Sequence, residues 1–123
     1  MFIKRETVTV TTVSAGTATA YSSIVNGRIL AIQYVKDGYA NGVDFTITTE
    51  TTAQSLWRKD SVDASAIQRP RVTVQNSTAS DVYYNDESDE EIMDYIHVAD
   101  ERIKIVLANG GDVKSGTFYI TVG

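Results

Sequence analysis

The amino-acid sequence predicts an all-β protein, an antiparallel β-sandwich or small barrel of about seven to eight strands. The first observation is composition, because the chain has 15 Thr, 14 Val and 11 Ile but only 3 Leu. β-Branched side chains lose rotamer freedom in a helix and pack well on a pleated sheet, so this ratio favours strands. The second observation is a period-two alternation of apolar and polar residues, and the third is the turn-forming sequences between the alternating segments.

Four segments alternate apolar and polar side chains and therefore predict strands with one buried and one exposed face. They are residues 7–11, 43–48, 102–107 and 117–122. A further segment, residues 28–36, reads RILAIQYVK and is apolar on both faces. This pattern predicts a central strand that is covered on both sides.

Two turn signals predict hairpins. The pair Asn26-Gly27 lies between residues 21–25 and residues 28–36. An Asn-Gly pair suits a two-residue hairpin, because both positions accept positive φ. Residues 109–112 (NGGD) predict a loop of about seven residues that joins the last two strands as a hairpin. The order of the strands in the sheet does not follow from these signals.

The length of 123 residues fits one domain, so we predict a single β-sandwich domain over residues 1–123. The clearest break in composition is residues 76–94, which carry seven of the sixteen acidic residues. We interpret this segment as a long acidic excursion from the sandwich, either solvated or forming a patch for a basic partner. Dense carboxylates also suit a hard cation, but the Gly and Glu of an EF-hand do not fall at the required positions here.

The net charge of −5 and the dispersed Lys and Arg residues argue against a nucleic-acid partner, because phosphate binding needs clustered positive charge. No apolar stretch reaches membrane-spanning length, and no basic start followed by an unbroken apolar run marks a signal peptide. We therefore expect neither nucleic acid nor membrane as a partner.

The residue inventory also offers little for catalysis, and we expect no enzyme activity, cofactor or metal. The chain has no cysteine, and its single histidine, His97, has no nucleophile motif beside it. The crowded acidic residues lack the apolar pocket that raises the pKa of a glycosidase acid. A phosphate-binding glycine motif is also missing.

Aromatic residues in predicted loops are the best candidates for exposed contacts, and these are Tyr39, Tyr83 and Tyr84. Tyrosine is enriched in protein interfaces because it combines apolar area with a polar tip. Exposed coplanar rings would also suit a carbohydrate-binding module, so that function stays open as an alternative.

Several segments carry a resemblance to a known class of proteins. They are residues 15–21 (AGTATAY), 26–29 (NGRI), 97–106 (HVADERIKIV), 109–111 (NGG) and 114–118 (KSGTF). In order and spacing they resemble small virion structural proteins of tailed bacteriophages, several of which are capsid decoration or cement proteins. The acidic segment, residues 76–94, departs from that pattern, and no functional residue of the family can be carried over.

The resemblance implies a virion protein that is assembled in the host cytoplasm and binds the major capsid protein or another virion protein. It also implies a homo-oligomer, with a trimer favoured. We expect the loops and residues 1–6, including Phe2, Lys4 and Arg5, to contact the shell, so that deleting residues 1–6 abolishes occupancy. A tail, adaptor or fibre-base component of the virion is the alternative that keeps the resemblance.

Overall fold

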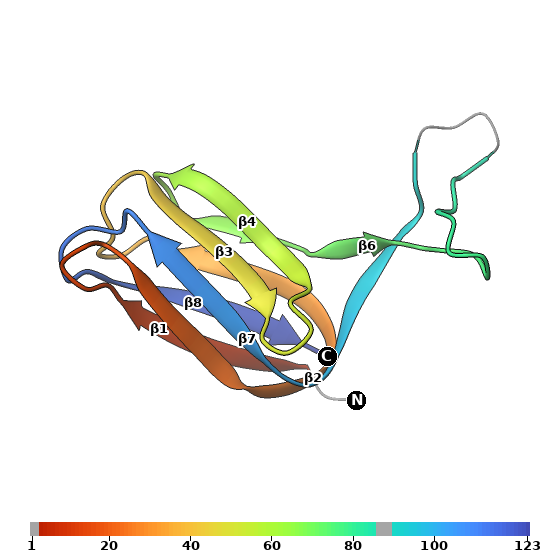
Figure 1. The fold of residues 1–123 in the computed structure, drawn as a ribbon, viewed down its shortest axis with the longest axis horizontal. Coiled ribbons are helices and arrows are strands. Elements are labelled where there is room, and N and C mark those ends of the chain that lie inside the picture. The colour runs from red at the N-terminus through yellow and green to blue at the C-terminus, as the bar shows by residue number, and fades with distance from the viewer. Residues whose placement is uncertain (1–2, 86–89) are drawn as a thin grey trace.

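The computed structural model describes residues 3–85 and 90–123 and is built from β-strands (Figure 1). The eight strands are β1 (Lys4–Thr11), β2 (Ala18–Val35), β3 (Val43–Thr49), β4 (Ser55–Val62), β5 (Ala66–Gln68), β6 (Arg71–Thr73), β7 (Met93–Ala108) and β8 (Ser115–Val122). They pair antiparallel in the order β1-β8-β2-β7-β3-β4, with β5 on β2 and β6 on β7. The predicted all-β antiparallel fold is confirmed.

The long strand β2 bends and allows one sheet to fold into two layers. β2 pairs with β7 through residues 18–29 and with β8 through residues 29–35. We call β1, β8, β5 and the second half of β2 the β1 layer, and β3, β4, β7 and the first half of β2 the β3 layer. Within the described residues the end strands β1 and β4 do not pair with each other, so the sheet is sandwich-like and not closed into a barrel.

The bend in β2 corrects one prediction, because Asn26-Gly27 lies inside the strand and forms no hairpin. The register with β7 shifts between Val25 and Gly27, as it does at a β-bulge. The Asn26 side-chain oxygen accepts a hydrogen bond of 2.8 Å from the Asp100 amide, and Gly27 has a φ of 119°. The Asn-Gly pair therefore supplies the positive φ of a bulge and not that of a two-residue turn.

The predicted hairpin between the last two strands is also wrong. β7 and β8 are separated by β2 in the sheet, so residues 109–114 cross from the β3 layer to the β1 layer. The crossing is fixed by neighbouring loops: the Gly110 amide donates to the Gly16 carbonyl at 2.9 Å, and the Ala40 amide donates to the Gly110 carbonyl at 3.0 Å. These long-range hydrogen bonds stabilise residues 109–114 as a connection between the two layers and not as a tight hairpin turn.

An aromatic cluster joins the two layers. The Phe45 ring from β3 lies 5.4 Å from the Tyr34 ring on β2 and 5.3 Å from the Phe118 ring on β8, measured between ring centroids. Trp57 from β4 packs edge-on against Phe45 at 4.7 Å. The alternation read from the sequence places Phe45 and Phe118 on inward-facing positions, and both are fully buried.

Tyr39 belongs to the same core, so the prediction that it lies exposed in a loop is wrong. Only 3% of its surface is accessible, its ring stacks on Tyr34 at 6.0 Å, and its hydroxyl donates to the Val10 carbonyl. Burial raises the pKa of Tyr39 far above its ordinary value. The ring fits because Gly116 on β8 has no side chain at that point.

Candidate functional site

An arm leaves the sandwich between β5 and β7 and projects well away from it (Figure 1). We call residues 71–95 the arm. At its root, β6 pairs with the start of β7, with Arg71 opposite Tyr95 and Thr73 opposite Met93. The acidic excursion predicted for residues 76–94 lies within this arm, and its residues 86–89 lie outside the described residues.

Beyond the root, three chain segments meet in a small hydrogen-bonded junction. The Val74 amide donates to the Ile92 carbonyl, the Ile92 amide to the Val82 carbonyl, and the Val82 amide to the Val74 carbonyl, each at 2.8 Å. The three apolar residues are only half-buried. The arm therefore has backbone order of its own but adds nothing to the core of the sandwich.

A tight turn closes the first loop of the arm. The Asn76 side-chain oxygen accepts hydrogen bonds from the Thr78 amide at 2.9 Å and the Ser80 amide at 3.1 Å, and Ala79 has a φ of 62°. Asparagine oxygens commonly mimic a backbone carbonyl in this way. The turn-forming Asn76 is the sequence signal for this loop.

The side chains of Asp81 and Glu91 form a hydrogen-bonded carboxyl pair at the junction. The Thr73 hydroxyl donates to Asp81 at 3.0 Å, and this bond, together with one from Glu91, lowers the pKa of Asp81. The same bond to Asp81 raises the pKa of Glu91. When Glu91 is protonated, it is the donor and the Asp81 carboxylate is the acceptor.

We expect the arm to loosen as the pH rises through the raised pKa of Glu91, because the shared proton is then lost and two carboxylates face each other. Glu91 stabilises the ordered arm fully at a pH below the pKa that it has in the unfolded chain. Asp81 stabilises the ordered arm at higher pH, and this stabilisation is lost as the pH falls through the lowered pKa of Asp81. The arm is most ordered between these two pKa values. Hydrogen-exchange protection of the Val82 and Ile92 amides, followed from about pH 4 to pH 7, measures this.

Glu91→Gln keeps a donor at every pH and is expected to flatten that pH dependence. Asp94→Asn is the matched control, since it removes one carboxylate of the arm without touching the Asp81–Glu91 pair. Equal pH dependence in wild type and Glu91→Gln would contradict the shared proton.

The root of the arm is fixed to the body by stacked cations. The Arg71 guanidinium lies 4.1 Å and the Arg28 guanidinium 5.1 Å from the centre of the Tyr95 ring. Arg28 Nε also donates to the Gly123 carbonyl at 3.1 Å. Cation–π contacts of this kind contribute about 0.5–1 kcal/mol at exposed sites. The arm thus starts at the end of the sandwich that holds the C-terminus.

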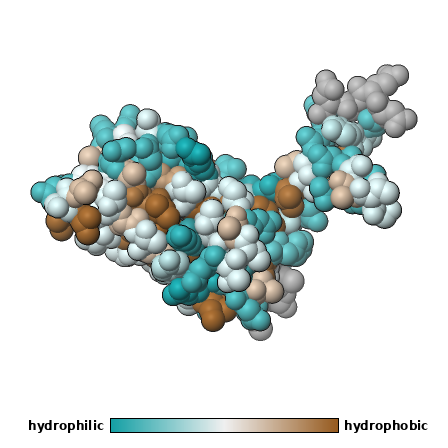
Figure 2. All heavy atoms as spheres, viewed as in Figure 1, coloured by the Kyte–Doolittle hydropathy of each residue, from teal (hydrophilic) through white to brown (hydrophobic). Residues whose placement is uncertain are grey.

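Tyr83 and Tyr84 are exposed on the arm, as the sequence predicted, with 45% and 67% of their surfaces accessible. Exposed apolar side chains at the root, Val72 and Met93, add to them. Figure 2 shows hydrophobic atoms where the arm joins the body, surrounded by hydrophilic ones.

The N-terminal candidates point to different sides of β1. Phe2 lies outside the described residues. Lys4 pairs with Glu6 at 3.2 Å, and the Arg5 guanidinium lies 5.1 Å from the centre of the Tyr119 ring on the outer face of the sheet. The structure therefore does not bring Lys4, Arg5, Tyr83 and Tyr84 into one site.

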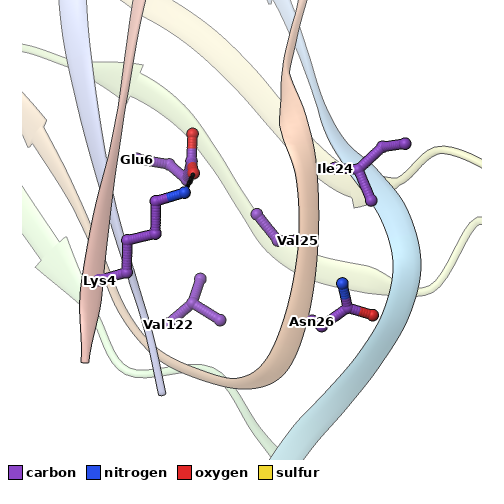
Figure 3. A pocket seen from close by; sticks show the side chains of 6 residues that line it. All are labelled: Lys4, Glu6, Ile24, Val25, Asn26 and Val122. Atoms are coloured by element: carbon purple, nitrogen blue, oxygen red, sulfur yellow. Dashed lines mark ion pairs between the residues drawn. The ribbon is translucent and has the colours of Figure 1, made fainter. Parts of the chain in front are cut away.

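A shallow hollow that the sequence did not reveal lies between β1 and β2, with a volume of about 260 Å³. Its lining comes from three strands and consists of Lys4, Glu6, Ile24, Val25, Asn26 and Val122 (Figure 3). The Lys4–Glu6 ion pair lines the hollow on the β1 side, and the exposed Ile24 side chain lines it on the β2 side. It lies at the same end of the sandwich as the arm root, because Lys4 pairs with Val122 next to Gly123.

A buried carboxylate outside the arm has a structural role. Glu101 is the buried acidic residue of the described core, and its carboxylate accepts the Thr51 amide at 2.9 Å and the Thr52 amide at 2.8 Å. The Thr52 amide is the main cause that lowers the pKa of Glu101. Glu101 therefore holds the β3–β4 turn as an ionised acceptor.

His97 lies on β7 opposite Arg28 and is exposed.

In the part of the chain that the structure describes, no group of three or more His, Cys, Asp or Glu side chains is placed to hold a metal ion. The same residues include no helix that is long and apolar enough to cross a membrane.

No protein-family model, no curated protein and no solved structure matches this chain.

Proposed function

We propose that this protein is a structural component of a tailed-bacteriophage virion, and specifically a capsid decoration (cement) protein that binds and stabilises the assembled head. Its partner is the major capsid protein or a neighbouring virion protein, and it acts in the virion as a homo-oligomer, with a trimer favoured. The sequence resemblance suggests the class. The observation that carries the proposal is the arm, which contributes nothing to the core and displays Tyr83 and Tyr84.

Several features suit such a role. A decoration protein must fold alone and then make many shallow contacts, which a two-layered sheet with long Thr-rich strands provides. The N-terminal residues, the hollow and the arm root all lie at one end of the sandwich, so one end presents several contact groups together. Binding to the assembled shell but not to its separate subunits stabilises the particle by mass action.

The test is electron cryo-microscopy of particles of the encoding phage, produced with and without this gene. A decoration protein gives density at sites spread over the whole head, and that density disappears without the gene. Density confined to one ring at the tail vertex supports the adaptor alternative instead. Particles identical in both preparations would rule out both forms of the proposal.

The N-terminal contact needs a milder variant than deletion of residues 1–6, because Lys4, Arg5 and Glu6 pair with β8 in the sheet. Deleting residues 1–3 leaves β1 intact and removes the exposed Ile3 side chain. We expect reduced occupancy when this variant is added to heads that lack the protein. Val113→Ser, an exposed change at the opposite end of β1 and β8, is the control and should bind like wild type.

A carbohydrate-binding module remains the second candidate because two tyrosines are exposed side by side on the arm. A glycan array with wild type and Tyr83→Ala/Tyr84→Ala separates the two functions: binding that the double variant loses would favour the carbohydrate function.

A further inference from the structure

One outer face of the sandwich consists mainly of uncharged polar residues together with Arg5. We call it the Tyr119 face: it is the outer side of the β1 layer, centred on Tyr119 with Arg5, Thr7, Thr9, Gln33 and Ile67 around it. The strand register places these residues together, because Thr7 and Gln33 both lie opposite Tyr119 and Ile67 lies opposite Gln33. Among the described residues that the register assigns to this face, Arg5 is the only charged one.

The arm has the complementary character. Residues 71–95 carry seven acidic residues and one basic residue, Arg71, so they contribute −6 to the net charge of −5. The rest of the chain therefore carries +1, from ten basic and nine acidic residues. Opposite charge on arm and body favours contact between them, but the arm points away from its own body (Figure 1).

The chemistry of the two surfaces also matches. Threonine hydroxyls and the Gln33 amide can donate to carboxylates, and Arg5 supplies a charge-assisted donor. Ile67 is an exposed apolar residue beside them, and Tyr119 offers a half-buried ring. These groups suit a strand-like segment that carries exposed tyrosines and acidic side chains.

We propose that the arm of one copy docks on the Tyr119 face of a second copy, so that the protein self-associates by arm-to-face contacts. Such a contact is heterologous, and its repetition builds a ring or an open chain of copies. The contact rests on the homo-oligomer of the proposed function but needs no virion component, so its failure would leave the proposed binding to the head standing. In the virion it would leave the N-terminal end free to face the shell.

The test is sedimentation equilibrium of the purified chain at low ionic strength. We expect concentration-dependent association that weakens with added salt, because Arg5 and the acidic arm are screened. Tyr84→Ser on the arm and Arg5→Glu on the face should each raise the dissociation constant about tenfold or more. The matched controls are Tyr21→Ser and Arg58→Glu, exposed changes in the β3 layer that should leave it unchanged.

An equal mixture of Arg5→Glu and Tyr84→Ser distinguishes arm-to-face contact from the other arrangements. The intact arm of the first variant can dock on the intact face of the second, so the mixture should associate more tightly than either variant alone. A mixture no tighter than the variants, controls that weaken association equally, or a wild type that stays monomeric at every concentration would each overturn the proposal. Circular dichroism verifies that all variants are folded.

Discussion

Replacing Gly116 with alanine is expected to destabilise the protein by about 3 kcal/mol or more, because the added methyl group has no space. A Cβ at this position would overlap the Tyr39 ring, with Cδ2 and Cζ at 2.7 Å and Cε2 closer still. The ring cannot move aside without losing its stacking on Tyr34 and its hydrogen bond to the Val10 carbonyl. Thermal unfolding should show a melting temperature lower by on the order of 10 °C.

Gly42→Ala is the matched control, because it also adds a methyl group to a glycine, but at a position where that group has space. Gly42 has a φ of 86° but no atom within 4 Å of an added Cβ, so alanine costs only the backbone penalty of about 1 kcal/mol. A double-mutant cycle identifies the clash directly: in a Tyr39→Ala background the Gly116→Ala change should cost much less. Additive losses in the cycle, or equal losses for the two glycines, would contradict this packing.

The sequence predicted the strands well because alternation reports the environment of each residue directly. The positions of Phe45 and Phe118 follow from a period of two, and both are buried as predicted. Turn chemistry was a weaker guide. The Asn26-Gly27 pair indicates only that a positive φ is favourable at this point. Whether it forms a hairpin or a bulge depends on the hydrogen bond from Asp100, which lies far away in the sequence.

The candidate surfaces were predicted only where local composition reveals them. The acidic segment and the exposure of Tyr83 and Tyr84 follow from the composition of residues 76–94. The burial of Tyr39 does not, because it depends on the missing side chain of Gly116 on another strand. The Tyr119 face was hidden for a related reason: alternation shows which side chains point outward, but not that β1 and β2 both flank β8.

Phe45→Ala is expected to have the largest effect of any single truncation in the core, a loss of about 3–5 kcal/mol. Only 1% of the Phe45 surface is accessible, and its ring contacts aromatic rings from both layers, so alanine leaves a cavity where the layers meet. Domains of this kind have a total stability of about 5–15 kcal/mol, so this one change removes a large share of it. Urea unfolding monitored by Trp57 fluorescence measures the loss.

The neighbouring Thr46→Ala provides the sharpest control for this interpretation of the fold. Thr46 is the next residue of β3 but faces outward, opposite Val106 and Arg58 on the adjoining strands. Its truncation should cost less than about 1 kcal/mol, since it opens no cavity. Both variants shorten a side chain on the same strand, so only the face they occupy separates them. A small loss at Phe45, or a loss at Thr46 of similar size, would show that the two layers do not pack through this cluster.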